Sequence, residues 1–225
     1  MRYRHVVYQD KPYELLVRNY QVEDFPALFQ VQRECFPEPF PQELLWTQEQ
    51  IESHVRHFPE GAICVEHDGK LVGSITGLVV RYHPGEPHTW SQITDNGYIR
   101  NHDPSGDSFY IVDVSVMPKY RSLGLGRLLM QAVYYVTVHK GLARVLGGGR
   151  IPGYHKLADQ YDVQTYVDKV AAGELTDPVM TFLLRCGRRP VQVMANYLDD
   201  EESCNYAVLM EWLNPFYDSL MSKKV

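Results

Sequence analysis

The sequence lacks the marks of a membrane-spanning or secreted protein. No run of apolar residues approaches the ~20 that a membrane span needs. The first residues, MRYRHVVYQDKPYE, contain neither the apolar segment nor the cleavage site of a signal peptide. The 4 cysteines are widely scattered with no C-x-x-C pair, which is typical of free thiols in a reducing compartment. We therefore expect a cytoplasmic protein with no membrane partner.

The chain also lacks the excess of positive charge with which proteins neutralise nucleic-acid phosphates. Lys and Arg number 22 against 28 Asp and Glu, a formal net charge of -6. We therefore expect no nucleic-acid partner. No Cys or carboxylate set accompanies the histidines at metal-binding spacing, so we expect no metal. We interpret these histidines as solvated surface residues: His54, His57, His83, His88 and His102.

Apolar periodicity predicts a mixed α/β fold built as a single domain with its core at about 13–212. Strands are expected at 13–18, 62–67, 70–82, 108–116, 143–146, 190–197 and 204–212. Helices are expected at about 24–35, 48–60, 124–139, 162–172 and 178–186, the second opened by a capping box of Thr47 and Gln50. Asp68-Gly69 predicts a tight hairpin turn, and the last two strands also read as a hairpin. These hairpins indicate antiparallel edges on a mixed sheet.

Residues 83–107 form a long insertion that is rich in turn-forming residues. Loops of this length often carry function in compact domains, although a plain surface insertion is the alternative. We expect Trp90, Asp95, Tyr98 and His102 to line an acceptor pocket, an expectation that rests on their location alone.

The stretch most informative about chemistry runs from Val114 to Leu129 and reads VSVMPKYRSLGLGRLL. It joins a strand to a helix through a turn that contains two glycines. The first N–H groups of a helix lack partners and carry partial positive charge, and glycines at 124 and 126 let an anion approach them closely. The Gly-Lys-Ser/Thr of a Walker loop is absent, and the dinucleotide pattern G-x-G-x-x-G fails at Leu129.

The pattern V-x-P-x-Y-R-x-x-G-x-G-x-x-L, from Val116 to Leu129, resembles the acetyl-CoA-binding motif of GNAT N-acetyltransferases. The order of elements from Tyr13 to Trp212 is similar as well. More closely, the chain resembles the acetyltransferase module that some bacterial proteins fuse to a carbon–nitrogen hydrolase domain. The resemblance implies a mostly antiparallel mixed sheet flanked by helices, and acetyl-CoA as cofactor.

In the family the motif strand splays from its neighbour, and its free backbone groups pair with the pantetheine arm of the cofactor. The pyrophosphate lies on the N–H groups at the helix start. Carried onto this chain, the resemblance assigns these cofactor-binding residues: Val114, Ser115, Val116, Arg121, Ser122, Leu123, Gly124, Leu125, Gly126 and Arg127.

Direct acetylation of an amine needs a base that takes a proton from the ammonium form of the acceptor. Asp113 lies three residues before Val116, where several family members also carry Asp. Many members place Glu one position earlier, but that position is Val112 here. Asp113 is therefore the candidate base, and a structural role at the border of the strand is the alternative.

Family members often place a tyrosine acid four residues before the glycine that ends the last helix, and this position is Leu183 here. Tyr154 is the candidate acid in its place, and Tyr110 is another. A packed tyrosine with a satisfied hydroxyl is the alternative for each, and the thiolate can also leave without an acid.

The resemblance implies an N-acetyltransferase that moves acetyl from acetyl-CoA to a primary amine of a small molecule or to an exposed amino group. The alternative is a non-catalytic acyl-CoA-binding sensor or regulatory module, which the departures at 112 and 183 favour. Dimers are common in the family, so a homodimer is compatible with this interpretation.

Overall fold

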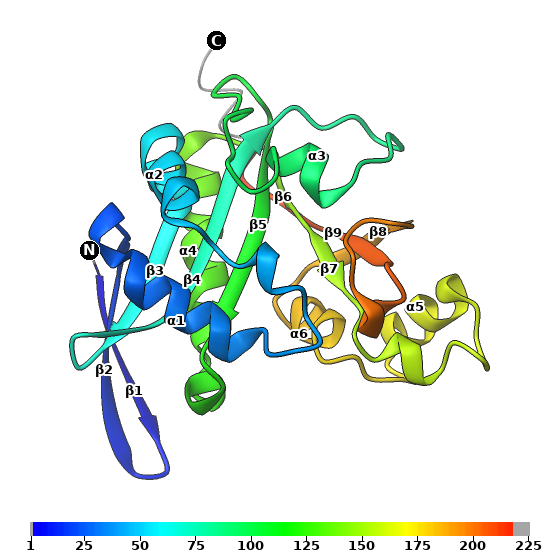
Figure 1. Cartoon of the computed structure of the whole chain (residues 1–225), viewed down its shortest axis with the longest axis horizontal. Coiled ribbons are helices and arrows are strands. Elements are labelled where there is room, and N and C mark those ends of the chain that lie inside the picture. The colour runs from blue at the N-terminus through cyan, green and yellow to red at the C-terminus, as the bar shows by residue number, and fades with distance from the viewer. Residues whose placement is uncertain (1, 218–225) are drawn as a thin grey trace.

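A nine-stranded sheet forms the centre of the computed structural model, which describes residues 2–217 (Figure 1). The strands are β1 Arg2–Tyr8, β2 Lys11–Asn19, β3 Ala62–His67, β4 Lys70–Val80, β5 Ser108–Val116, β6 Arg144–Leu146, β7 Gly148–Arg150, β8 Arg189–Met194 and β9 Ala207–Leu213. The helices are α1 Phe25–Cys35, α2 Gln48–His57, α3 Trp90–Thr94, α4 Leu125–Lys140, α5 Val163–Ala171 and α6 Met180–Arg185.

The strand order along the sheet is β1-β2-β3-β4-β5-β6-β9-β7, and β8 pairs with β9. Each pair is antiparallel except β5 with β6, which run parallel. A parallel neighbour requires a crossover, and α4 supplies it by packing on β3, β4 and β5. The expected mixed sheet, mostly antiparallel and flanked by helices, is confirmed.

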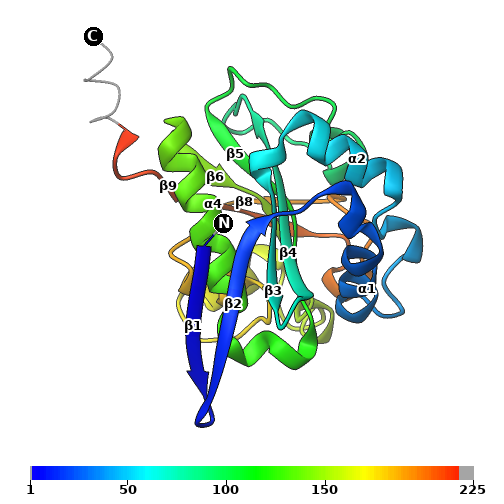
Figure 2. The same cartoon turned by 90° about the vertical axis from the view of Figure 1, so that its left-hand side faces the viewer.

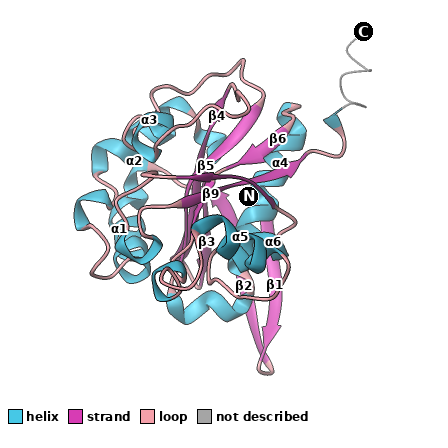
Figure 3. Cartoon of the chain, turned by 90° about the vertical axis from the view of Figure 1, so that its right-hand side faces the viewer, coloured by secondary structure: helices cyan, strands magenta, loops and turns pink. Residues whose placement is uncertain are grey.

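The helices cover both faces of the sheet. Figure 2 shows α4 on one face, with α1 and α2 on the other. At the far end, α5 and α6 lie side by side, with α5 against β8 and α6 against β7, as seen from the opposite direction in Figure 3. The core between these layers contains apolar side chains that are almost completely buried, such as Leu28, Ile75, Phe109 and Leu129. This layering leaves the β5 end of the sheet accessible between α1 and α6.

Local signals predicted several elements at their observed positions. Thr47 and Gln50 form the expected capping box, with the Gln50 amide donating to Thr47 Oγ1 at 3.3 Å. The central strand occupies Ser108–Val116 as expected. Gly141 ends α4 in the left-handed region, with φ of +68°. These features depend on neighbours within a few residues, which is why the sequence specifies them.

Three elements were not predicted. β1 pairs only with β2, and the two form a hairpin that projects from the body of the molecule (Figures 1 and 2). β7 lies in the glycine run at 148–150, which reads as a turn, but it pairs with β9. α3 is a short helix inside the 83–107 insertion, capped by Thr89. Within residues 2–217, no helix is long and apolar enough to cross a membrane.

Candidate active site

The central sheet opens next to β5, and this opening positions the site. β5 pairs with β4 along its whole length, whereas its pairing with β6 covers only Ser108, Phe109 and Tyr110. After Leu146 the chain continues into β7, which pairs with β9 and not with β5. β5 and β7 therefore diverge (Figure 1). The β5 edge from Ile111 to Val116 therefore has no strand partner on that side.

The start of α4 lies at the end of this free edge, as the motif predicted. Gly124 adopts a φ of +73°, and a Cβ at this position would have no other atom within 4 Å, so its surroundings are open. A Cβ on Gly126 would approach the ring of Phe182 on α6 to 2.9 Å, so this glycine lets α6 pack against the helix start. Gly124 thus leaves room for an anion, and Gly126 serves packing.

The remaining motif residues divide into exposed polar groups and buried anchors. Arg121, Ser122 and Arg127 are exposed, whereas Leu123 and Leu125 point into the core. Arg121 donates through Nε to the Val116 carbonyl at 3.2 Å, which holds its charge beside the loop. Leu123 and Leu125 can contribute only backbone groups to a ligand, because their side chains anchor the turn.

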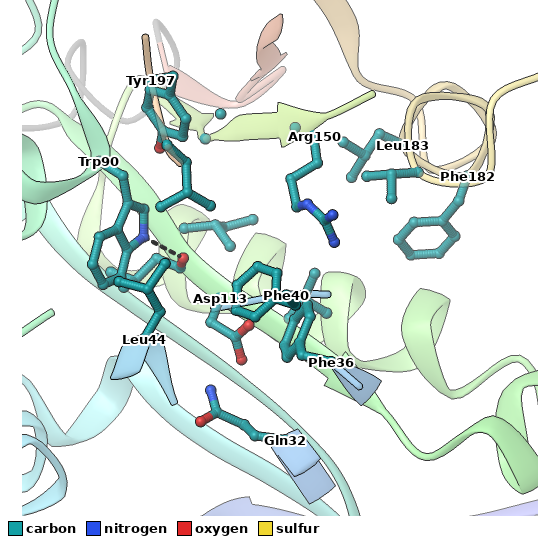
Figure 4. A pocket seen from close by; sticks show the side chains of 18 of the residues that line it. Gln32, Phe36, Phe40, Leu44, Trp90, Asp113, Arg150, Phe182, Leu183 and Tyr197 are labelled. Carbon is teal, nitrogen blue, oxygen red and sulfur yellow. Dashed lines mark hydrogen bonds between the residues drawn. The ribbon is translucent and has the colours of Figure 1, made fainter. Parts of the chain in front are cut away.

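A pocket of about 160 Å³ follows the opening between β5 and β7 (Figure 4). A cavity of about 150 Å³ is large enough to hold benzene, so this pocket suits a small group. Its floor is the backbone of residues 111–114 and 147–150. Its walls are mostly apolar side chains from the segment between α1 and α2, from α3, and from α6 and the residue before it: Phe36, Phe40, Leu44, Trp46, Trp90, Val179, Phe182 and Leu183.

Asp113 lines this pocket from β5 and is the one carboxylate among the lining residues (Figure 4). Burial raises the pKa of Asp113 from its usual value to about 6, and the Ser115 and Gln32 side chains lower it in part. Ser115 donates through Oγ to Asp113 Oδ2 at 2.9 Å. Gln32 is itself held by the Trp46 amide, which donates to its Oε1 at 2.6 Å. A carboxylate with this pKa both accepts and releases a proton near neutral pH.

Of the four insertion residues expected to line an acceptor pocket, only Trp90 does so. Its Nε1 donates to the Val112 carbonyl at 3.1 Å on the free edge of β5. Asp95 pairs with Arg100, whose guanidinium lies over the ring of Tyr98. His102 stacks on Phe58 in the interior instead. The expectation is wrong for these three because the insertion folds on itself and against α2.

Tyr154 does not line this pocket. Its ring packs against Tyr166 and Tyr206, and its hydroxyl donates to the Tyr161 carbonyl at 3.3 Å. Leu183 occupies the expected position on α6 and lines the pocket as an apolar residue. Tyr197 lines the pocket, and its hydroxyl lies 2.9 Å from that of Tyr110, which is outside it.

The interpretation of the histidines as solvated is wrong for His54. This residue is fully buried, with Nε2 2.6 Å from the Gly97 carbonyl and Nδ1 3.0 Å from the Tyr20 hydroxyl. Burial lowers the pKa of His54 to about 4, so the ring is neutral. His102 accepts from the Val79 amide, and His88 contacts Tyr110. Their ring nitrogens serve hydrogen bonds across the fold, which spacing along the chain does not indicate.

Two arginines line the pocket without having been expected there. Arg150 lies over the Phe40 ring and pairs with Asp200 and Glu202. Arg188 is buried and has no carboxylate partner within residues 2–217, and burial lowers its pKa to about 10. One of its N–H groups donates to the Met210 carbonyl. Over the same residues, no group of three His, Cys, Asp or Glu side chains lies close enough to hold a metal.

Several pocket residues were missed: Gln32, Phe36, Phe40, Leu44, Trp46, Arg150, Arg188, Tyr197 and Leu198. The FPEPFP segment at residues 36–41 contains two of them, Phe36 and Phe40. Its Phe-Pro pairs are a weak indication of pocket residues, because aromatic rings in a proline-rich segment become buried only by packing against another surface. The other residues come from distant parts of the chain and give no local signal.

A splayed strand that leads into a glycine-containing helix start, beside an apolar pocket with one carboxylate, defines an acyltransferase-type site. The model of the acetyltransferase (GNAT) family matches residues 25–148. The chain is 53% identical over 213 residues to the "Uncharacterized N-acetyltransferase YkwB" of Bacillus subtilis, covering 94% of each protein. The chain belongs to the GNAT family and is an N-acetyltransferase.

Two further comparisons concern a longer protein and the fold. The chain is 38% identical over 213 residues to the "Probable hydrolase YhcX" of Bacillus subtilis, covering 94% of this chain but only 41% of that protein. Its resemblance to a module of a longer protein is thereby confirmed. The solved structure of the GNAT-like decarboxylase GphF with isobutyryl-CoA superimposes with a TM-score of 0.73 at 22% identity, over 88% of this chain and 99% of that one. At this identity the likeness concerns the fold.

Proposed function

We propose that this N-acetyltransferase takes its acetyl group from acetyl-CoA and transfers it directly to a primary amine. The observation that carries the proposal is the free edge of β5 running into the open helix start at Gly124, beside a pocket that contains Asp113. Acetyl-CoA supplies the thioester, and every other contribution comes from the chain. The binding of isobutyryl-CoA by GphF, which shares the fold, supports this class of donor.

The backbone of Val114, Ser115 and Val116 would hold the pantetheine arm in the manner of an added strand. The N–H groups from Ser122 to Arg127 would hold the pyrophosphate, with the helix start supplying partial positive charge. Two observations support this fit: a Cβ at Gly124 would meet open space, and Arg121 and Arg127 are both exposed beside the turn. Their charges would complement the phosphates.

The walls of the pocket favour an acceptor that carries an apolar group next to its amine. Phe36, Phe40 and Trp90 supply flat apolar surfaces on the side of α1 and the insertion. Asp113 supplies a negative charge that attracts an ammonium group. A small arylalkylamine and an exposed amino group flanked by an apolar side chain share this chemistry.

Asp113 would take a proton from the attacking nitrogen and hold it on its carboxylate. The pKa of about 6 suits this role, because the group is mostly deprotonated at neutral pH and still basic enough to accept. Ser115 and Gln32 orient the carboxylate. Since Tyr154 packs outside the pocket, a general acid at that position is not supported.

The proposal is tested in two steps on the purified full chain. Calorimetric titration with CoA should give saturable binding, and acetyl-CoA with a panel of amines should release free thiol in an amine-dependent manner. Benzylamine, phenethylamine, spermidine and a Phe-initiated tripeptide cover the acceptor chemistry. No heat of binding at millimolar CoA would refute the proposal. Binding without amine-dependent thiol release would instead support the sensor alternative, which none of the comparisons favours.

The expectations of a cytoplasmic location, of no nucleic-acid partner and of a homodimer remain predictions. The exposed apolar side chains of Tyr3 and Val7 on β1, 59% and 73% accessible, are compatible with a subunit contact. Sedimentation velocity at micromolar concentration tests the homodimer directly.

A further inference from the structure

A chain of hydrogen-bonded side chains connects the pocket with a second cavity at the surface. Tyr197 lines the pocket next to Trp90, and its hydroxyl lies 2.9 Å from the hydroxyl of Tyr110 (Figure 4). The Tyr110 hydroxyl lies 2.9 Å from Nε2 of His88. Tyr110 and His88 both line the second cavity, which the first part of the insertion borders. The three side chains therefore form a continuous path from the pocket to solvent.

The surrounding backbone holds this path in place. The Trp90 amide donates to the Tyr197 carbonyl at 2.8 Å, which ties the insertion to the segment between β8 and β9. A Cβ on Gly148 would come within 2.6 Å of the Tyr197 hydroxyl, so the glycine of β7 makes room for the phenol. Tyr110 and Tyr197 are almost completely buried, at 1% and 3% exposure. Such constraint keeps the hydroxyls aligned, as proton transfer along hydrogen bonds requires.

Acetylation of an ammonium acceptor releases one net proton, which must leave the site. The ammonium nitrogen carries three protons, and the amide product keeps one. One of the other two converts the departing CoA thiolate into a thiol, and the last must reach solvent. In the reaction the N–C bond forms and the C–S bond breaks, and no electrons are exchanged with a redox partner. Asp113 can carry the proton destined for sulfur.

We propose that Tyr197, Tyr110 and His88 form a proton relay that carries the surplus proton of the acceptor ammonium to solvent. This inference rests on the proposed function. Nε2 of His88 takes the proton of Tyr110 while Tyr110 takes that of Tyr197 and Tyr197 takes the surplus proton of the ammonium. The imidazolium then releases the proton on Nδ1 to water. Tyr197 touches the acceptor, and Tyr110 and His88 act through it.

The charges around the relay fit this direction of transfer. Arg188 is buried nearby, and its cation lowers the pKa of both tyrosines against the larger effect of burial, which raises the pKa of Tyr197 to about 12. Its cation thus stabilises transient negative charge on the phenols. Burial lowers the pKa of His88, so the ring is neutral and able to accept. Arg81, His83 and Glu86 are charged or titratable side chains that line the same surface cavity as His88.

Two acceptors separate a relay from a packing role. Benzylamine is an ammonium ion at neutral pH and releases a net proton, whereas aniline is neutral and releases none. His88→Ala should lower kcat for benzylamine about 10- to 100-fold, which is smaller than the usual loss of a general acid–base group. It should change the rate with aniline by less than about 2-fold. Imidazole in the buffer should restore part of the benzylamine rate through the surface cavity.

His139→Ala is the matched control, because this histidine is exposed on α4 and lies outside both cavities. It should leave both rates unchanged. An unchanged benzylamine rate in His88→Ala, or an equal loss with both amines, would overturn the relay while leaving the proposed function intact. A wild-type chain that transfers acetyl to no amine of the whole panel contradicts the proposed function.

A measurement on the ligand-free chain tests the hydrogen bonds without turnover. The ¹⁵N shifts of His88 should show the neutral ring protonated on Nδ1, with Nε2 accepting from Tyr110. Tyr110→Phe removes that donor and should raise the pKa of His88, and Tyr197→Phe should shift it by less in the same direction. Tyr13→Phe, on β2, should not shift it. A His88 that titrates identically in wild type and in Tyr110→Phe would refute the relay even if no amine were accepted.

Discussion

At the scale of a single residue, the carboxyl group of Asp113 lowers the stability of the folded chain but suits the proposed reaction. Its pKa of about 6 exceeds the usual 3.8, so the folded chain binds the proton more tightly than the unfolded chain. The free energy of unfolding therefore falls as the pH rises from about 4 to about 6, by up to about 3 kcal/mol. A carboxylate in an apolar pocket is retained there at a cost, as expected of a residue that serves the reaction.

Asp113→Asn should lower turnover about 100-fold at pH 8, because it removes the base, and should leave CoA affinity within about 2-fold. The variant should also unfold at higher urea than wild type at pH 8, and this advantage should shrink as the pH falls toward 4. Kinetics and urea unfolding at both pH values measure this. Asp159→Asn, on an exposed carboxylate, is the control. A pH–rate profile unaltered by Asp113→Asn would remove Asp113 as the base.

Gly124→Glu should abolish CoA binding, because it places a negative side chain where the phosphates would lie. Gly173→Glu is a matched control: Gly173 has a φ of +79° and, like Gly124, no atom within 4 Å of a built Cβ. Both substitutions should cost roughly 1 kcal/mol of backbone strain. Only the first should remove the calorimetric signal of CoA, and equal affinity in the two variants would refute the placement of the pyrophosphate.

At the scale of elements, His54 joins α2 to the insertion and to the first strands. The ring contacts the Gly97 carbonyl and the Tyr20 hydroxyl, and Tyr20 in turn lies 2.8 Å from Thr76 Oγ1 on β4. Because the folded pKa of about 4 lies below the usual 6.5, the unfolded chain binds the proton more tightly. Stability is therefore complete above about pH 6.5 and is lost as the pH falls toward 4.

We predict that wild type loses up to about 3 kcal/mol of stability through His54 between pH 6.5 and 4. His54→Gln should be less stable at pH 7.5 by about 1–3 kcal/mol, because buried partners are left unpaired. It should lack this part of the acid dependence. Urea unfolding at pH 7.5 and pH 5 measures both, with the exposed His139→Gln as control. An identical acid dependence in His54→Gln and wild type would contradict the role.

The elements also differ in how readily the sequence predicts them. β5 and the capping box of α2 were predicted because their signals lie within the element itself. β7 was missed because Gly148 and Gly149 have the conformational freedom of a turn, and only pairing with β9, some 60 residues later in the chain, makes them a strand. β1 was missed because its charged residues resemble a solvated tail, although pairing with β2 orders them.

For the whole molecule, we predict one cooperative unfolding transition, since a continuous sheet and one buried cluster extend from β2 to β9. Trp46 and Trp90 report on the pocket, and Trp212 reports on β9. Fluorescence and calorimetry of the same Trp212→Phe variant should give the same midpoint. Two separate transitions would contradict the expected single domain.

Binding of CoA should stabilise this whole unit. At a concentration 100 times the Kd, CoA adds about 2.7 kcal/mol to the free energy of unfolding, because it binds the folded chain alone. Differential scanning calorimetry with and without CoA measures the shift, and Gly124→Glu serves as the control that should not shift. A transition temperature of wild type that is independent of CoA would contradict binding.

The sequence by itself determined the fold class and the strand, turn and helix start that form the proposed cofactor end of the candidate site. A strand, a turn with two glycines and a helix start are formed by contacts between near neighbours, so the segment from Val114 to Arg127 carries its own instructions. The acceptor end was decided only by the tertiary structure. Gln32, Trp90, Arg188 and Tyr197 lie far apart in the chain, and packing of the core brings them to one pocket.

The same distinction explains the two tyrosine outcomes. Tyr154 follows a glycine-rich strand end, which made it the candidate acid, but its ring packs against Tyr166 and Tyr206, as the alternative of a packed tyrosine had it. Tyr197 has no local feature that marks it, and its position depends on the space left by Gly148 and on the Trp90 amide. Hydrogen bonds and ring packing between distant residues are set by the assembled core, so no pattern along the chain reveals them.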